Sequence, residues 1–296
     1  MEKYDIIIIG AGPAGLTAAL YASRAGHKVL VLEGKAVGGQ IINSIKVKNY
    51  PAILEISGAD FAKNLKKQVN NYGGVIKLEK VVAISDNPKW VVKTDMEKEY
   101  SASAIILATG SVPRPLGLDN EDKFVGRGVS YCATCDGNFY KDKVIAVEGG
   151  GNTALYDALY LADLAKKVYL IHRRDEFRGD KALVEQLAKK DNVGLILSAQ
   201  VTSLIGDDHL EKIVLDNDRE LEVSGLFVAI GYKPQNEIFN DVVELDENGY
   251  VKTRDGVHTS AEKIYVAGDA RKKELRQLTT AVSDGAIAAT TAIQEM

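Results

Sequence analysis

The chain has few of the residues that build metal sites or disulfide frameworks. Its 296 residues include two cysteines and four scattered histidines. Two cysteines cannot form a four-cysteine zinc site or a network of structural disulfides, so we expect no bound metal. In an intracellular protein, a close cysteine pair is more often catalytic or metal-binding than structural.

An excess of one charge and long apolar runs are also lacking. The 37 Lys and Arg against 41 Asp and Glu give a net charge of −4, which offers no basic field to nucleic acid or to an anionic membrane. No stretch approaches the roughly 20 apolar residues of a membrane helix. The apolar run after Asp5 is too short for the core of a signal peptide. We therefore expect a cytoplasmic protein that binds neither nucleic acid nor membranes.

The two cysteines lie together in the segment Cys132-Ala133-Thr134-Cys135. Such a pair can cycle between dithiol and disulfide, and the motif often lowers the pKa of one thiol, which favours disulfide exchange. Asp136 follows directly, and its carboxyl could shuttle the proton that thiol chemistry requires. The alternatives are half of a zinc site for the cysteines and a turn-forming role before Gly137 for Asp136.

A glycine-rich fingerprint near the N-terminus predicts a dinucleotide site. Gly10-Ala11-Gly12-Pro13-Ala14-Gly15 follows a predicted strand over 6–9 and opens a predicted helix over 13–25. Its backbone N–H groups and helix N-terminus suit a pyrophosphate. Glu33 ends the next predicted strand, over 28–33, where a carboxylate accepts hydrogen bonds from ribose hydroxyls and repels a 2′-phosphate. The alternative is a tight strand–helix turn that binds nothing.

A second fingerprint, Gly149-Gly150-Gly151-Asn152-Thr153-Ala154, follows a predicted strand over 144–147 and opens a helix reaching about residue 165. The returning strand, over 167–172, ends before Arg173, which lies 24 residues after Gly149, close to the Gly10–Glu33 offset. Arg173, Arg174 and Arg178 could bind a phosphate dianion through charge-assisted hydrogen bonds, which indicates NADP rather than NAD. The alternative is a solvated basic loop that pairs with Asp175 and Glu176.

The order of the segments predicts two domains, one inserted into the other. Buried-type strands ending in Ala-x-Gly follow each fingerprint, at 104–110 and 226–231, and a last strand (263–267) and helix (278–294) complete the first domain. We expect an α/β fold with two Rossmann-like dinucleotide-binding domains. Their boundaries are 1–112, 113–232 and 233–296, where the middle segment is the inserted domain.

Taken together, the motifs closely resemble the low-molecular-weight, bacterial-type thioredoxin reductases over essentially the whole chain. The matching segments are GAGPAG at 10–15, GGQ at 38–40, NYP at 49–51, ATG at 108–110, CATCDG at 132–137, GGGNTA at 149–154, HRRxxxR at 172–178 and GDxRxxxxRQ from Gly268. Related two-domain ferredoxin–NADP reductases lack the cysteine pair and fit less well.

This resemblance implies FAD in the outer segments, NADPH in the inserted domain, thioredoxin as partner and a homodimer. FAD would be lined by Gly10, Gly12, Pro13, Ala14, Gly15, Glu33, Gly39, Gln40, Asn49, Asp269, Arg276 and Gln277. NADPH would be bound by Gly149, Gly151, Asn152, Thr153, Arg173, Arg174 and Arg178. Cys135 would face the flavin, Cys132 would exchange with thioredoxin, and Asp136 would be the acid–base residue.

Two residues depart from the family pattern. Glu148 stands where an aliphatic strand residue is usual, and Ala52 replaces a glycine. A carboxylate at 148 could be buried and oppose the pyrophosphate, or it could point to solvent or pair with a Lys or Arg. Three other functions stay open: a thioredoxin reductase that takes electrons from ferredoxin, an oxidase that closes a disulfide in a small dithiol, and a flavin-binding redox sensor.

Overall fold

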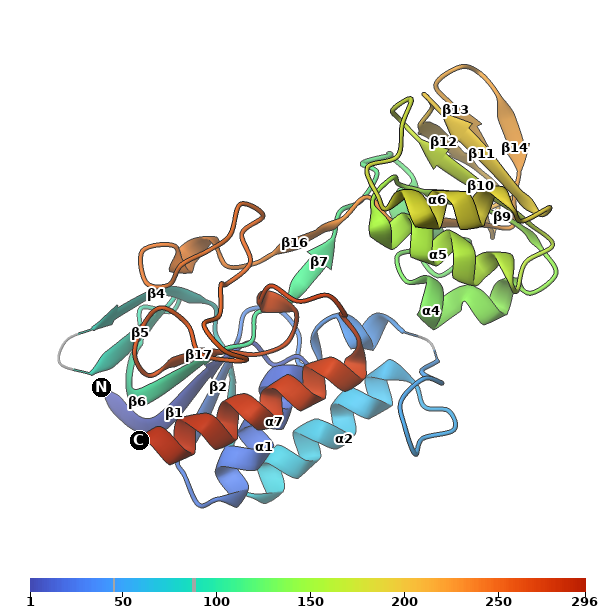
Figure 1. The fold of residues 1–296 in the computed structure, drawn as a ribbon. Helices are drawn as coiled ribbons and strands as arrows, with labels where there is room; N and C mark the ends of the chain where they lie inside the picture. The colour runs from blue at the N-terminus through green and yellow to red at the C-terminus, as the bar shows by residue number, and fades with distance from the viewer. Residues whose placement is uncertain (45, 87–88) are drawn as a thin grey trace. The chain divides into compact units, whose positions relative to one another are not determined.

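The computed structural model describes residues 1–44, 46–86 and 89–296. The chain divides into two compact units (Figure 1). The first unit comprises Met1–Val112 and Lys233–Met296, and the second comprises Pro113–Tyr232. Each unit has its own hydrophobic clusters and its own central sheet, which is mixed in the first unit, where β4 and β5 are antiparallel, and parallel in the second.

The sheet of the first unit has the strand order β3-β2-β1-β6-β5-β4, with β17 paired to β6. The strands are β1 Glu2–Ile9, β2 Val29–Glu33, β3 Val75–Leu78, β4 Val81–Asp86, β5 Trp90–Thr94, β6 Glu99–Leu107 and β17 Ile264–Val266. Both faces of β1 are buried: Ile6 and Ile8 belong to one hydrophobic cluster, whereas Ile7 and Ile9 belong to another. This explains why the strand reads as a continuous apolar run.

Three helices pack together in the first unit (Figure 1): α1 Pro13–Arg24, α2 Gly58–Asn71 and α7 Leu278–Glu295. Short 3₁₀ turns lie at η1 Gly39–Asn43, η3 Glu237–Phe239 and η4 Gly268–Ala270. Glycine allows α7 to approach α1 closely, because a Cβ atom on Gly285 would lie 2.2 Å from the carbonyl oxygen of Ala14. The start of α1 is thereby packed against segments from the end of the chain.

The second unit holds a five-stranded parallel sheet, β11-β10-β9-β15-β8, and a three-stranded antiparallel sheet, β12-β13-β14. The strands are β8 Val129–Ser130, β9 Val144–Glu148, β10 Lys167–His172, β11 Val193–Leu197, β12 Val201–Ile205, β13 Lys212–Leu215, β14 Glu220–Glu222 and β15 Gly225–Val228. The helices are α3 Glu121–Phe124, α4 Ala133–Asp136, η2 Gly137–Tyr140, α5 Asn152–Ala162 and α6 Lys181–Ala188.

Alternation along the central strands separates the two faces of this parallel sheet. Val147 packs in one cluster with α5 and α6, while Ala146 packs in another with β12, β13 and β14. The two connections between the units, β7 Ser111–Pro113 and β16 Tyr232–Pro234, pair with each other. Beside them the Arg114 amide donates to the Gly231 carbonyl at 2.9 Å.

The predicted α/β fold with two Rossmann-like sheets is confirmed. Some elements are shorter than the sequence indicated. Helix α5 ends at Ala162, and strand β15 ends at Val228. The left-handed backbone of Gly231, with φ of 110°, is suited to a turn between β15 and β16.

Candidate functional site

The cysteine pair lies at the start of the short helix α4 in the second unit. Cys132 and Cys135 form a disulfide with 5.3 Å between their Cα atoms. Cys132 is the N-cap residue, and its carbonyl accepts hydrogen bonds from the amides of Cys135 and Asp136. Both cysteines are only partly buried, which leaves the pair accessible for exchange.

Asp136 ends the same helix turn and is held by Ser130. The Ser130 hydroxyl donates a 2.6 Å hydrogen bond to Asp136 Oδ2, and it accepts one from the Cys132 amide at 3.1 Å. Burial raises the pKa of Asp136, and the hydrogen bond from Ser130 opposes that rise. A carboxyl with a raised pKa beside a disulfide can take up and release protons closer to neutral pH. Ser130 did not stand out in the sequence.

The first fingerprint forms the turn between β1 and α1. Gly10 has φ of 107°, and a Cβ atom there would lie 2.3 Å from the Ala108 carbonyl oxygen. Gly12 caps α1 and Pro13 is its first residue, so the helix N-terminus is bounded by small residues. Glu33 accepts hydrogen bonds from the Ala11 amide at 2.7 Å and from the Lys35 amide at 2.8 Å. Its carboxylate is therefore fixed beside the fingerprint.

Segments distant in sequence meet beside this fingerprint. A Cβ atom on Gly268 would lie 2.8 Å from the Ala14 Cβ, so Asp269 follows a residue that contacts α1. A Cβ atom on Gly39 would lie 3.1 Å from the Gly12 Cα, which brings the predicted Gly39-Gln40 segment to the same loop. The chain thus forms a close-packed cradle of backbone around the N-terminus of α1.

Two further residues predicted for this site, Asp269 and Arg276, carry buried polar atoms. Arg276 Nε has no hydrogen-bond partner within the described parts of the chain. Asp269 Oδ1 lies 3.1 Å from Lys273 Nζ as an ion pair. The Arg276 guanidinium stacks on the Tyr250 ring at 4.3 Å. Buried polar atoms of this kind suit a polar ligand.

Gln277 links the start of α7 to Asn49. Its side-chain oxygen accepts a 3.1 Å hydrogen bond from Asn49 Nδ2. It also caps α7 through a capping box with Thr280. Asn49, which is exposed, is thereby held at the start of this helix.

Asp284 on α7 is a further residue that the sequence did not indicate. It accepts hydrogen bonds from the Gly268 amide at 3.0 Å, from Arg271 at 2.9 Å and from Lys273 at 3.1 Å. Burial alone would raise the pKa of Asp284, but the Arg271 hydrogen bond and the charges of Lys273 and Arg271 hold it below its usual value. Asp284 therefore fixes the turn that carries Asp269.

The second fingerprint forms the turn between β9 and α5. Gly149 has φ of 154°, and a Cβ atom there would lie 2.4 Å from the Ala229 carbonyl oxygen. A Cβ atom on Gly151, the N-cap of α5, would meet no atom of the described residues within 4 Å. The approach to the N-terminus of α5 is thus open. Asn152 and Thr153 are both exposed there.

The arginine-rich loop after β10 docks on this second fingerprint. The Arg178 amide donates to the Gly150 carbonyl at 2.8 Å, and the His172 ring would lie 2.2 Å from a Cβ atom on Gly150. Arg173, Arg174 and Arg178 are exposed. Within the described residues, none of these guanidiniums forms an ion pair, so the expected alternative of pairing with neighbouring carboxylates is not observed.

The charges of these arginines affect the pKa of His172. Burial lowers the pKa of its imidazole, and the positive charges of Arg178, Arg173 and Arg174 lower it further. The ring is 4% exposed and stacks on Phe177. It is therefore a neutral support for the loop.

Glu148 is buried and does not pair with a Lys or Arg in the described chain. It shares the face of Ala146, against β12, and lies opposite the face that α5 covers. Oε1 accepts a long 3.4 Å hydrogen bond from the Val201 amide, while Oε2 has no partner among the described residues. Burial raises the pKa of Glu148 to about 7. Neither the solvent-exposed nor the ion-paired alternative is correct.

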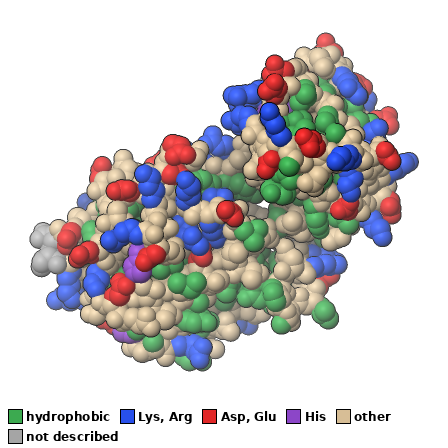
Figure 2. All heavy atoms as spheres, in the orientation of Figure 1, with side chains coloured by type: hydrophobic (Ala, Val, Ile, Leu, Met, Phe, Trp, Pro, Cys, Tyr) green, Lys and Arg blue, Asp and Glu red, His purple; other side chains and the backbone are tan. Residues whose placement is uncertain are grey.

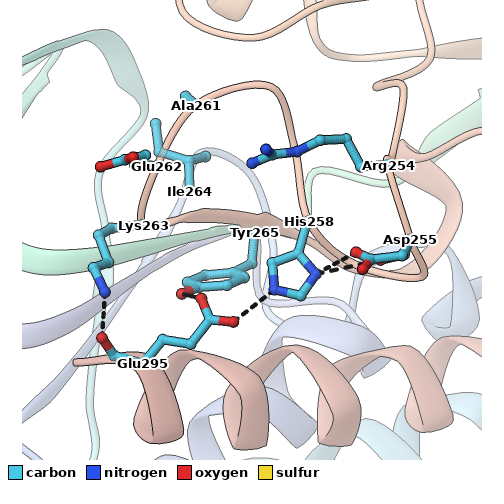
Figure 3. A pocket seen from close by; sticks show the side chains of 9 residues that line it. All are labelled: Arg254, Asp255, His258, Ala261, Glu262, Lys263, Ile264, Tyr265 and Glu295. Carbon is cyan, nitrogen blue, oxygen red and sulfur yellow. Dashed lines mark hydrogen bonds and ion pairs between the residues drawn. The ribbon is translucent and has the colours of Figure 1, made fainter.

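A pocket of about 510 Å³ lies in the first unit, away from the predicted site residues (Figure 3). His258 hydrogen-bonds to Asp255 at 2.5 Å and to Glu295 at 2.8 Å, and Glu295 also accepts a 2.6 Å hydrogen bond from Tyr265. Lys263 donates to the Glu295 carbonyl. The polar groups of this pocket are largely satisfied by one another, so it is a weak candidate for a ligand site.

Over the described ranges, no group of His, Cys, Asp and Glu is arranged to hold a metal ion. In the same ranges, no helix is both long and apolar enough to cross a membrane. On the face shown in Figure 2, Lys and Arg are interspersed with Asp and Glu in both units.

Known proteins match this chain along nearly its whole length. The family model described as pyridine nucleotide-disulphide oxidoreductase matches residues 4–285. A thioredoxin reductase of Peptoclostridium acidaminophilum is 41% identical over 301 residues, covering 98% of this chain and 96% of that protein. A thioredoxin reductase of Treponema pallidum is 41% identical, with coverage of 97% and 95%.

Solved structures agree with these sequence matches. The thioredoxin reductase from Streptococcus pyogenes has a TM-score of 0.91 at 36% identity, covering 99% of this chain and 97% of its own. The enzyme from Giardia duodenalis has a TM-score of 0.92 at 31% identity, covering 99% of both chains. The chain therefore belongs to the pyridine nucleotide-disulphide oxidoreductases and, within that family, to the thioredoxin reductases.

Proposed function

We propose that this oxidoreductase uses NADPH and FAD to reduce the Cys132–Cys135 disulfide, and that the resulting dithiol reduces thioredoxin in the cytoplasm. The observation that carries the proposal is the disulfide at the start of α4, in the same unit as a glycine-rich fingerprint beside three guanidiniums that form no ion pair within the described residues. The thioredoxin reductases at about 40% identity support the choice of partner.

The first unit fits FAD. The cradle around α1 offers backbone and a helix N-terminus to a pyrophosphate, and Glu33 offers a carboxylate to ribose hydroxyls. Asp269, Arg276, Gln277, Asn49 and the Gly39-Gln40 segment would line the rest of the site. The buried Arg276 Nε would gain a partner from such a polar ligand.

The second unit fits NADPH. The open N-terminus of α5, with Gly149, Gly151, Asn152 and Thr153, suits the pyrophosphate. Arg173, Arg174 and Arg178 suit the 2′-phosphate, because planar guanidiniums bind phosphate through charge-assisted hydrogen bonds. The docking of their loop on Gly150 holds them near the same helix end.

FAD and NADPH, when bound, supply hydride and two-electron transfer. The chain's own residues then perform the thiol chemistry. In the dithiol form, the Cys132 thiolate attacks one sulfur of the thioredoxin disulfide and releases the other as a thiolate. Cys135 attacks the mixed disulfide, which restores the Cys132–Cys135 bond and leaves thioredoxin as a dithiol. Asp136 exchanges the protons that the leaving thiolates require.

An anaerobic titration tests this function. The purified flavoprotein should bleach on addition of NADPH, and it should then reduce thioredoxin. Cys132→Ser and Cys135→Ser should each abolish thioredoxin reduction but keep FAD bound and reducible by NADPH. Bleaching by reduced ferredoxin and not by NADPH would overturn the choice of donor, and thioredoxin turnover at a near wild-type rate in Cys132→Ser would overturn the mechanism.

A homodimer is part of the same proposal, carried over from the resemblance to the family. Sedimentation of the purified protein at several concentrations tests it. A single species with the mass of one 32.0 kDa chain at every concentration would contradict it.

A further inference from the structure

Ser130 occupies a buried position at the end of an edge strand. It ends β8, pairs with Phe227 of β15 and is 4% exposed. Its hydroxyl nevertheless makes two close polar contacts, to the Asp136 carboxylate at 2.6 Å and to the Cys132 amide at 3.1 Å. A buried hydroxyl therefore links the residue proposed for proton transfer to the backbone of the cysteine proposed for exchange.

We propose that Ser130 is a positioning residue of the dithiol site, which holds the Asp136 carboxylate in one orientation and fixes the backbone of Cys132 at the start of α4. The inference rests on the proposed function, because it assigns Ser130 a task in the acid–base chemistry of Asp136. Ser130 acts through these two residues and needs no contact with thioredoxin.

The hydroxyl has a single proton, so its hydrogen bonds depend on the protonation state of Asp136. With Asp136 ionised, the proton is donated to Oδ2 in a short, charge-assisted bond. With Asp136 protonated, the carboxyl itself can donate to Ser130, whose proton is then free to turn toward the Cys132 carbonyl oxygen at 3.4 Å. The contact of the Ser130 hydroxyl with the Cys132 carbonyl is longer than its contact with Asp136 Oδ2. Ser130 therefore favours the ionised carboxylate over the protonated carboxyl of Asp136.

The surroundings of Asp136 offer few competing charges. The elements that pack most closely against α4 are η2 and α5, and their titratable side chains are Tyr140, Tyr156, Asp157 and Tyr160. In the dithiol form the Cys132 and Cys135 thiols of the same helix turn titrate as well. Burial raises the pKa of Tyr140 to about 12, with a smaller contribution from Asp136, so this phenol stays neutral in the relevant range. Burial also raises the pKa of Asp157 to about 7, so Asp157 must be separated from Asp136 in any titration.

Three serine variants test the proposal. Ser130→Ala removes the hydroxyl, and Ser130→Thr keeps it. Ser23→Ala is the matched control, because Ser23 is 6% exposed and its hydroxyl has no hydrogen-bond partner among the described residues. The dithiol form, prepared with dithiothreitol, is followed by NMR of labelled aspartate carboxyl carbons against pH. The Asp136 and Asp157 signals are assigned with Asp136→Asn and Asp157→Asn.

Ser130→Ala should raise the pKa of Asp136 by about one unit, because a charge-assisted hydrogen bond to the carboxylate is lost. The acidic limb of the rate at which the dithiol reduces a small aromatic disulfide should move by the same amount. Ser130→Thr should restore the wild-type titration, and Ser23→Ala should leave it unchanged. An Asp136 titration that is unmoved in Ser130→Ala, or a threonine variant that behaves like alanine, would overturn the proposal.

This design separates the inference from the proposed function. The NMR titration and the small-disulfide reaction need neither NADPH nor thioredoxin. If the wild-type protein fails to reduce thioredoxin but the pKa of Asp136 still rises in Ser130→Ala, only the proposed function is contradicted. If the wild-type protein reduces thioredoxin but the pKa of Asp136 is the same in Ser130→Ala, only the role of Ser130 is contradicted.

Discussion

The Glu148 carboxylate contacts the Val201 amide across the interior of the second unit, at 3.4 Å, and no cation in the described chain neutralises it. Its side chain is 7% exposed. Burial is the main cause of its raised pKa of about 7, and the charges of Glu121 and Asp216 add to the effect of burial. A carboxyl in such a place costs stability when it ionises.

Glu148→Gln should therefore stabilise the protein at high pH. The folded state retains a proton that the unfolded state releases near the ordinary value of 4.5, so stability falls as pH rises from about 4.5 to about 7. The shift corresponds to roughly 3 kcal/mol. We expect a gain approaching that size in the free energy of urea unfolding at about pH 8, and little gain at about pH 4.5.

Glu121→Gln is the matched contrast in the same core. Glu121 is 2% exposed, but its oxygens accept hydrogen bonds from Leu116, Gly117 and Tyr131. Glu121→Gln should destabilise the protein, since the NH₂ group of the glutamine side chain cannot accept these hydrogen bonds. Equal gains for Glu148→Gln at both pH values would show that the carboxyl ionises alike in the folded and unfolded states.

Nucleotide choice gives a second prediction. Arg173→Ala and Arg174→Ala should each weaken NADPH binding by about tenfold or more, because each loses charge-assisted hydrogen bonds of about 1.5–3 kcal/mol. NADH, which lacks the 2′-phosphate, should bind as before. Isothermal titration with both nucleotides measures this, and Arg219→Ala, an exposed arginine elsewhere in the unit, is the control. Equal losses for NADPH and NADH would exclude recognition of the 2′-phosphate.

Patterns among neighbouring residues predicted the strands and turns that depend mainly on local sequence. The apolar run 6–9, the glycine loops and the arginines after β10 each follow from neighbouring residues, and the structure contains the corresponding strands and turns. Alternation with Ala146 could have placed Glu148 on the face away from α5, but the sequence does not say that β12 covers that face.

Residues whose importance comes from tertiary contacts were missed for the same reason. Asp284 lies inside an ordinary helical pattern, and only the folded chain brings it to Gly268, Arg271 and Lys273. Ser130 lies two residues before Cys132, but nothing in the sequence indicates that its hydroxyl reaches Asp136. Burial and long-range hydrogen bonds are not visible in local periodicity.

Asp284→Asn gives a third prediction. The amide can still accept from the Gly268 amide, but it leaves Lys273, whose side chain is 6% exposed, without one of its two carboxylate partners. Breaking a buried ion pair costs roughly 3–5 kcal/mol. We expect a loss of that order in urea unfolding of the FAD-free protein, together with weaker FAD retention. Asp241→Asn, at an exposed position, should change neither, and wild-type stability in Asp284→Asn would exclude a structural role for its charge.

The His258 contacts in Figure 3 predict a pH-dependent anchor for the end of α7. The hydrogen bond that His258 donates to the Glu295 carboxylate is the main cause of the raised pKa of His258, and Asp255 contributes as well. Because the folded pKa lies above the ordinary 6.5, this stabilisation is complete below that value and is lost as pH rises through the folded pKa. His258→Asn should therefore lower the thermal midpoint more at about pH 5.5 than at about pH 8.5.

The control is His209→Asn, since His209 is exposed and has no ion pair within the described ranges. A loss in His258→Asn that is the same at both pH values would mean that the imidazole contributes by packing and not by its charge.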